Sequence, residues 1–275
     1  MHLKRWITGL VALPFLIYII VRGGMVFTLF IGLVALIALW EFFRVTLNGA
    51  DNVSLVPMKI LAYLYAVLIL WSAHHLSPAF ILNSVVFCFW LTGFVSILLF
   101  KNDPMVFETA KKQLLGILYI PLLLSYLILV RNGSATSGAV WIFFILVVVF
   151  TGDIGALYAG TFLGKHKLYP ALSPKKTIEG SMGGIIANIF FGAIFKMIFL
   201  PELPWGTSLL FFIALGAAGQ IGDLFESGLK RVGHIKDSGG ILPGHGGILD
   251  RIDAAMYAAP VAYLFKVYIF GSSPM

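Results

Sequence analysis

The sequence predicts an all-α, polytopic membrane protein, and three observations support this fold class. Of the 275 residues, 60% are hydrophobic and only 11% are charged, whereas about 25% are charged in an ordinary soluble domain. The mean hydropathy is +0.97. The apolar residues form continuous runs and do not alternate with polar ones, which favours spanning helices over a transmembrane β-barrel. This composition excludes a soluble globular enzyme, a disordered chain and a nucleic-acid-binding domain.

Nine apolar runs are predicted to cross the membrane, because a helix needs about 20 residues to span the hydrocarbon core. The first run resembles a signal peptide, but no small-residue cleavage pattern closes it, so we expect a retained span. The nine runs cover residues 6–22, 25–41, 59–76, 78–100, 114–130, 138–163, 180–200, 206–222 and 254–270.

The basic residues predict the orientation of these spans. With the N-terminus in the cytoplasm and alternating spans, 15 of the 19 Lys and Arg residues fall in cytoplasmic segments. This asymmetry is the positive-inside pattern, and it accounts for the net charge of +7 without a nucleic-acid partner. The four basic residues on the opposite side are Arg22, Arg131, Lys196 and Lys266.

The chain is predicted to form a single integral membrane domain over residues 1–275. Residues 1–137 are mainly hydrophobic spans, and residues 138–275 form the half that carries the chemistry. Seven of the 12 acidic residues lie in or beside the two long cytoplasmic segments of this second half. Glu41, at the cytoplasmic end of an early span, is expected to be structural.

The first chemical motif covers residues 151–180. Gly152, Ala156, Gly160 and Gly164 recur every four residues, a spacing that lets another helix approach closely, either within the chain or in a homodimer. Asp153 lies beside this stripe at the membrane edge. A charge at bilayer depth costs about 2.5–3.5 kcal/mol, so Asp153 is expected to face a polar cavity. The alternative is an ordinary carboxylate at a helix end.

The segment Ser173-Pro174-Lys175-Lys176 predicts a helix start, with Ser173 as the N-cap and Pro174 in the first position. Two lysines in the first turn oppose the helix dipole. A bound anion would resolve this conflict, because free backbone N–H groups and ammonium groups would converge on it. The alternative is ordinary positive charge in a cytoplasmic loop.

The second motif lies at the end of the eighth predicted span. Asp223, Glu226, Ser227 and Lys230 share one helix face at positions i, i+3, i+4 and i+7. Two acids, a hydroxyl and a cation on one face are suited to bind a metal ion beside a phosphate. The alternative is a surface ladder of salt bridges.

The third motif is rich in glycine, with five glycines among residues 239–247. Such a backbone can turn its N–H groups toward phosphate oxygens. Asp250 and Asp253 follow one helical turn apart. Oxygen ligands without a thiolate cluster favour Mg²⁺ over zinc. Carboxylates, cations and a glycine-rich loop on one side of a membrane predict phosphoryl or nucleotidyl transfer with a lipid substrate.

One segment resembles the signature of the phosphatidate cytidylyltransferases, also called CDP-diacylglycerol synthases. The stretches around Asp153, residues 173–180 and residues 222–227 are also similar to that family, so the resemblance covers roughly residues 150–255. The signature segment reads Ser227-x-x-Lys230-Arg231-x4-Lys236-Asp237-x5-Pro243-Gly244-His245-Gly246-Gly247-x-x-Asp250-Arg251-x-Asp253.

The resemblance implies an enzyme that converts CTP and phosphatidic acid to CDP-diacylglycerol and pyrophosphate, for phospholipid biosynthesis. It implies Mg²⁺ as the cofactor, with a second cation left open. The implied location is the bacterial-type plasma or inner membrane, with the active site facing the cytoplasm. The expected partners are CTP, phosphatidic acid and the lipid bilayer, with no nucleic acid and with a homodimer left open.

The resemblance also implies three sets of site residues, and Asp223 and Asp250 are the pair expected to share the ion. The implied catalytic residues are Asp223, Lys230, Arg231, Lys236, Asp237, His245, Asp250 and Arg251. The implied substrate-binding residues are Lys165, Ser173, Lys175, Lys176, Thr177, Glu179, Ser227, Gly246 and Gly247. The implied metal ligands are Asp153, Asp223, Glu226, Asp250 and Asp253.

Three alternatives stay open at this stage. A related membrane cytidylyltransferase or lipid kinase would act on an isoprenoid lipid. A transporter for a phosphorylated solute should show broken helices in paired halves, and no internal repeat is evident in the sequence. A lipid-alcohol phosphotransferase should carry its own acid-rich motif on consecutive helix turns, which the sequence does not show.

Overall fold

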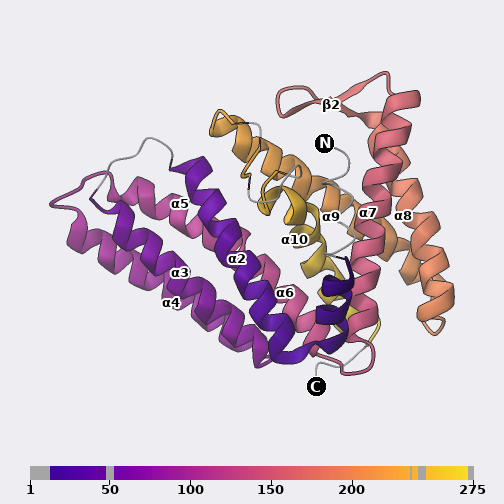
Figure 1. The fold of residues 1–275 in the computed structure, drawn as a ribbon, viewed down its shortest axis with the longest axis horizontal. Coiled ribbons are helices and arrows are strands. Elements are labelled where there is room, and N and C mark those ends of the chain that lie inside the picture. The colour runs from indigo at the N-terminus through magenta and orange to yellow at the C-terminus, as the bar shows by residue number, and fades with distance from the viewer. Residues whose placement is uncertain (1–12, 48–52, 236, 241–245, 272–275) are drawn as a thin grey trace.

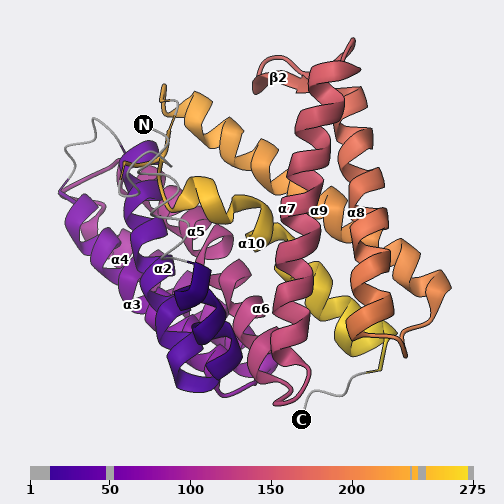
Figure 2. The ribbon, with the colours of Figure 1, turned by 45° about the vertical axis from the view of Figure 1, so that its right-hand side comes forward.

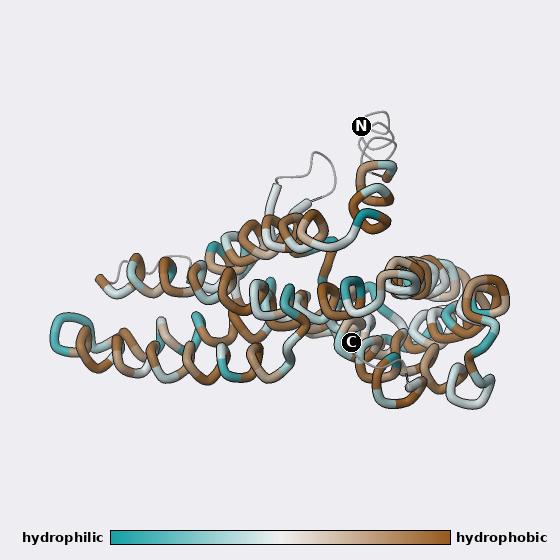
Figure 3. Tube along the Cα trace, turned by 90° about the horizontal axis from the view of Figure 1, so that it is seen from below, coloured by the Kyte–Doolittle hydropathy of each residue, from teal (hydrophilic) through white to brown (hydrophobic). Residues whose placement is uncertain are grey.

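The structure is a computed structural model that describes residues 13–47, 53–235, 237–240 and 246–271. Within these ranges, eight helical segments are long and apolar enough to cross a bilayer, and Leu13–Arg22 is a shorter apolar helix. Large apolar side chains such as Leu29, Phe89 and Ile186 point outward, each about two-thirds exposed. Figure 3 shows hydrophobic residues along all the described helices. The prediction of an all-α, polytopic membrane protein is confirmed.

The helices follow the predicted runs, with two groups separated at residue 138. The first group contains α2 (Gly24–Thr46), α3 (Leu55–His74), α4 (Pro78–Leu99), α5 (Val106–Tyr119) and α6 (Pro121–Asn132). The second group contains α7 (Gly138–Phe162), α8 (Ile178–Phe199), α9 (Trp205–Val232), α10 (Leu249–Leu264) and the π-helix η1 (Phe265–Ile269).

Two spans differ from their predicted bounds for physical reasons. The run predicted at 114–130 is an interrupted segment that starts at Val106, and Pro121 begins α6 because proline has no N–H to continue α5. The run predicted at 206–222 continues as helix to Val232. This extension carries the polar motif of residues 223–230 beyond the apolar part of α9.

Within the second group, α10 is the helix that lies against the first group, as Figures 1 and 2 show. It packs on α9, α6, α7 and α2. Small side chains make this central position possible, since Ala254, Ala258, Ala259 and Ala262 are all buried. Residues from both halves of the chain therefore meet on α10.

A short β-hairpin connects α7 to α8 in place of the helix start predicted at Ser173. Strand β1 (Lys167–Tyr169) pairs antiparallel with β2 (Ser173–Thr177). The helix begins later, and the Thr177 hydroxyl accepts the Gly180 N–H as its N-cap at 3.1 Å. The predicted helix start at Ser173 was therefore wrong, because Lys175 and Lys176 lie in the strand and not in the first turn of α8. That turn contains Glu179, whose negative charge is favourable at the N-terminal end of a helix dipole.

The small-residue stripe of α7 packs against α8 in the same chain. A Cβ on Gly160 would lie 3.5 Å from the Gly180 Cα, and a Cβ on Gly152 would overlap the Asn188 side chain. This close approach brings the start of α8, and the hairpin before it, against α7.

Of the four basic residues predicted to lie opposite the cytoplasm, three are buried and bind backbone carbonyls. Arg131 donates to the carbonyls of Ile20 and Val21, Lys196 donates to that of Pro201, and Lys266 donates to that of Val130. Each of the three side chains is at most 5% exposed. They bind backbone carbonyls at or beside helix ends, so each has a structural role that does not depend on the side of the membrane on which it lies.

Candidate active site

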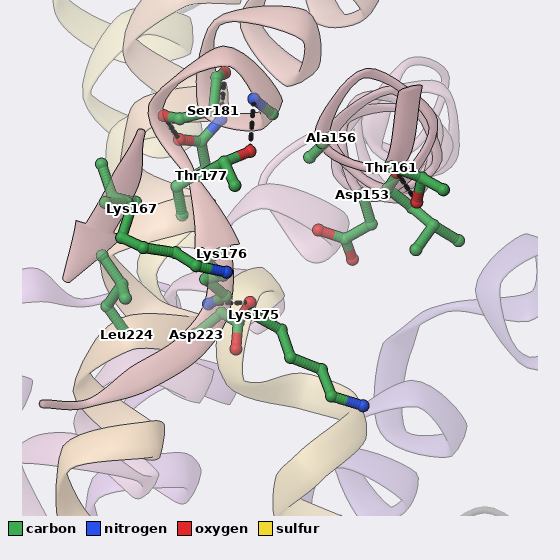
Figure 4. Close-up of a pocket in the computed structure, with 15 residues that line it drawn as sticks. Asp153, Ala156, Thr161, Lys167, Lys175, Lys176, Thr177, Ser181, Asp223 and Leu224 are labelled. Atoms are coloured by element: carbon green, nitrogen blue, oxygen red, sulfur yellow. Dashed lines mark hydrogen bonds and ion pairs between the residues drawn. The ribbon is translucent and has the colours of Figure 1, made fainter. Parts of the chain in front are cut away.

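A cavity of about 480 Å³ lies between α7, the β-hairpin, the start of α8 and the polar extension of α9. Figure 4 shows the groups that line it. Asp153 and Asp223 contribute carboxylates, and the hairpin contributes the ammonium groups of Lys167, Lys175 and Lys176. Leu157, Leu168 and Leu224 are among the apolar residues of the wall. One cavity therefore combines charges suited to phosphates with a surface suited to lipid.

Lys176 and Asp223 form an ion pair inside this cavity, which we call the open pair (Figure 4). The side chains are 29% and 36% exposed. Strand β2 supplies the lysine and the extension of α9 supplies the aspartate. The hairpin is also held to α9 by Arg231, which donates to the Leu172 carbonyl at 3.1 Å. These contacts fix the lysines of the hairpin over the end of α9.

A second group of charges lies at the contact of α9 with α10, and we call Lys230, Glu226 and Asp250 the closed cluster. Lys230 pairs with Glu226 one turn earlier and with Asp250 Oδ1 at 2.7 Å. The Lys230, Glu226 and Asp250 side chains are 17%, 1% and 8% exposed. The helix face predicted from the sequence is therefore divided, because Asp223 turns to the hairpin and Glu226 and Lys230 turn to α10.

The glycine-rich loop is organised around the other oxygen of Asp250. Asp250 Oδ2 accepts hydrogen bonds from the Ser238 N–H and hydroxyl, each at 3.0 Å, and from the Gly247 N–H at 2.9 Å. Gly246 has φ of +80°, and a Cβ there would lie 2.9 Å from the same oxygen. In the described part of the loop, the Gly247 amide thus faces a carboxylate of the protein.

Three aspartates come from three helices that pack on one another: Asp153 on α7 and Asp223 on α9 line the cavity, and Asp253 lies on α10. Asp253 is buried. Within the described ranges, no group of three or more His, Cys, Asp or Glu side chains is arranged so that it could hold a metal ion by itself. The structure gives Asp223 and Asp250, the pair expected to share an ion, different lysine partners.

The remaining site residues expected from sequence fall into three groups. Glu179 binds the backbone N–H groups of Lys165 and His166 and the His166 ring, so it holds the turn before the hairpin. Arg251 interacts with Asp153, while Asp237 is exposed and Ser173 and Ser227 are half-buried. Lys236 and His245 lie outside the described residues.

Sequence reasoning did not assign Ser181 and Gln220 to the site, although both line the cavity. Gln220 donates its side-chain N–H to the Ser181 carbonyl at 3.0 Å, and the Ser181 hydroxyl donates back to the Gln220 side chain. The pair joins α8 to α9 at the base of the site. The signal that indicates it is Gln220, a polar side chain three residues before Asp223 in a stretch, residues 209–222, that is otherwise apolar or small.

Comparison with known proteins agrees with this geometry. The model of the cytidylyltransferase family matches residues 3–269. A phosphatidate cytidylyltransferase of Bacillus subtilis is 35% identical over 266 residues, covering 94% of this chain and 96% of that protein. One of Staphylococcus epidermidis is 34% identical over 263 residues, covering 96% and 98%. One of Staphylococcus saprophyticus is 34% identical over 266 residues, covering 96% and 99%. This chain therefore belongs to the cytidylyltransferase family.

Proposed function

We propose that this chain transfers the cytidylyl group of CTP to phosphatidic acid, giving CDP-diacylglycerol and pyrophosphate for phospholipid synthesis. The observation that carries the proposal is the cavity itself, where three lysines and two aspartates share one space with an apolar wall at the end of the membrane helices. The names of the relatives, which are phosphatidate cytidylyltransferases, support the same substrates.

The reaction places a large negative charge in this cavity. An oxygen of the phosphatidate phosphate attacks the α-phosphorus of CTP, a P–O bond forms, and the bond to the β-phosphate oxygen breaks as pyrophosphate leaves. The attacking oxygen is already anionic, so no strong general base is required. Catalysis then depends on positioning and on neutralising charge, which Lys167, Lys175 and Lys176 are placed to do.

The donor chemistry of the site also fits Mg²⁺, which prefers carboxylate oxygens and substrate phosphates. We propose that Asp153 and Asp223, which line the same cavity from two helices, hold the ion together with phosphate oxygens of the substrate. When bound, the ion would neutralise charge on the triphosphate and the leaving pyrophosphate. Lys176 already places one positive charge on Asp223. Glu226 and Asp250 are left to hold Lys230.

We further propose that the cavity faces the cytoplasm of a bacterial-type membrane. The support is the distribution of basic residues, since three of the four exceptions are buried contacts with backbone carbonyls. Single cysteines at the exposed positions Lys101 and Thr136, with Cys88 replaced by Ser, provide the test. We expect an impermeant thiol reagent to label position 101 from the cytoplasmic face and position 136 from the opposite face. The reverse pattern would refute this orientation.

Product identity tests the reaction. Purified protein in detergent should release pyrophosphate from labelled CTP only when phosphatidate and Mg²⁺ are both present, and the label should move into the lipid. A lipid kinase would release CDP in place of pyrophosphate. Activity with an isoprenoid phosphate and none with phosphatidate would assign the chain to a different lipid.

A further inference from the structure

Glu41, on α2 in the first half of the chain, is fully buried and reaches the active-site loop. Its carboxylate accepts three hydrogen bonds: from the Ile248 N–H at 3.1 Å, the Leu249 N–H at 2.8 Å and the Ser238 hydroxyl at 3.2 Å. The two amides belong to the N-terminal end of α10, where backbone N–H groups have no partner within the helix. Glu41 therefore caps α10 from a distant helix.

Ser238 connects this cap to the closed cluster. Its hydroxyl oxygen lies 3.2 Å from Glu41 Oε2 and 3.0 Å from Asp250 Oδ2, so its single proton bridges the two carboxylates. Arg44, one turn after Glu41, donates to the Ser238 carbonyl at 2.5 Å. Helix α2 thus holds both the side chain and the backbone of Ser238.

Two glycines of the loop are explained by the same carboxylate. A Cβ on Gly239 would overlap Glu41 Oε1, and a Cβ on Gly247 would overlap the Ser238 hydroxyl and lie 2.5 Å from Glu41 Oε2. Real Cβ atoms do not approach other atoms this closely. The backbone at these two positions passes directly against Glu41 and Ser238, which explains why both are glycine.

We infer that Glu41 is a positioning residue for the reaction. By holding Ser238 and the first turn of α10, it fixes Asp250 against Lys230 and sets the place of Asp253 on the next turn. Glu41 touches neither substrate nor metal in this scheme and acts through the loop. The inference rests on the proposed cytidylyl transfer, and activity of the unmodified protein tests that proposal separately.

Asp103 provides a matched control in the same half of the chain. It is a buried carboxylate that also accepts three hydrogen bonds, from the Ser54 N–H at 3.1 Å, the Ser54 hydroxyl at 2.5 Å and the Met105 N–H at 2.9 Å. The hydrogen bond from the Ser54 hydroxyl lowers the pKa of Asp103, so this carboxylate is charged at neutral pH. Asp103 ties the loop before α3 to the loop before α5, away from Ser238.

The experiment compares Glu41→Gln with Asp103→Asn by steady-state kinetics and thermal unfolding of the purified proteins. Glutamine keeps the shape of Glu41 but turns an N–H group toward a backbone N–H. We expect Glu41→Gln to lower kcat about tenfold or more with a smaller change in KM. Asp103→Asn should keep kcat within about twofold, even if its unfolding temperature falls as far as that of Glu41→Gln. Equal losses of kcat in the two variants, or an unchanged kcat in Glu41→Gln, would overturn the inference.

Ser238→Ala tests whether Glu41 acts through Ser238, and it does so even if the Glu41→Gln variant does not fold. It removes only the bridging hydroxyl, and we expect kcat to fall about threefold to tenfold while the unfolding temperature falls no more than in Asp103→Asn. When combined, Glu41→Gln and Ser238→Ala should cost little more than the worse single change, because both break the same link. Full additivity, or wild-type kcat in Ser238→Ala, would show that Glu41 does not act through Ser238.

Discussion

The open pair and the closed cluster contain the same chemical groups in different surroundings. In the open pair, the Lys176 and Asp223 side chains are 29% and 36% exposed. In the closed cluster, Glu226 is 1% exposed and Asp250 is 8% exposed, and further donors saturate Asp250. An exposed pair contributes little to stability and exchanges partners easily, whereas removing one member of a buried pair is costly. We therefore expect the open pair to bind substrate and the closed cluster to hold the scaffold.

Asp223→Asn should show the largest separation of activity from stability. If Asp223 holds a metal that stabilises the transition state, the variant should lose about 10³-fold in kcat. Its unfolding temperature should barely change, because the side chain is partly exposed. Kinetics and differential scanning calorimetry on one preparation measure both quantities. Glu108→Gln is the matched control, since Glu108 also pairs with a lysine, Lys111, at an exposed position. A wild-type kcat in Asp223→Asn would show that Asp223 has no role in catalysis.

Asp250→Asn should lose both activity and stability. The change removes the charge that pairs with Lys230 and leaves one acceptor oxygen in place of two. Either Lys230 or the donors of Ser238 and Gly247 then face an N–H group. We expect the free energy of unfolding to fall by about 3 kcal/mol. We expect kcat to fall about 10²-fold, since each 1.36 kcal/mol of transition-state stabilisation is a factor of ten. Denaturant unfolding beside the kinetic assay measures the two effects. A large loss of activity without any loss of stability would instead make Asp250 a metal ligand, as the sequence motif first suggests.

Lys176→Gln should have a smaller effect than Asp223→Asn or Asp250→Asn, and it should change substrate binding more than turnover. Losing one of three lysines that line the cavity should raise KM for CTP or phosphatidate about tenfold, because the other two still attract the phosphates. Lys111→Gln, at the exposed pair on α5, should leave both constants unchanged. Initial rates with each substrate varied in turn are the measurement. An unchanged KM for both substrates would show that Lys176 does not bind either of them.

The sequence predicted the features that depend on local composition. Span length and hydropathy predicted the helices, and the spacing of one helical turn predicted that Glu226 and Lys230 meet, because both properties are encoded within a few turns. The partners of these side chains were not predictable in the same way. The choice of Lys176 for Asp223 and of Asp250 for Lys230 is made between elements that only the fold brings together.

The hairpin and Glu41 show the same limit. Ser173 and Pro174 have the local signature of a helix start, but pairing with Lys167–Tyr169 makes the segment a strand. Glu41 stands at the end of an apolar run, and a charge there is a general signal of function. Its three donors belong to Ser238, Ile248 and Leu249, and no spacing rule connects residues so far apart in the chain.

The bond between α2 and α10 has a consequence for biosynthesis. Glu41 is synthesised 207 residues before Ile248, which at about 5–20 residues per second is on the order of 10–40 s of translation. During that interval the carboxylate has none of its three donors, and burying an unpaired charge is prohibitive. We therefore expect this end of α2 to stay hydrated while the later helices insert. The first span to carry an acid is thus among the last to finish packing, and the arrival of α10 completes the assembly of the nascent protein.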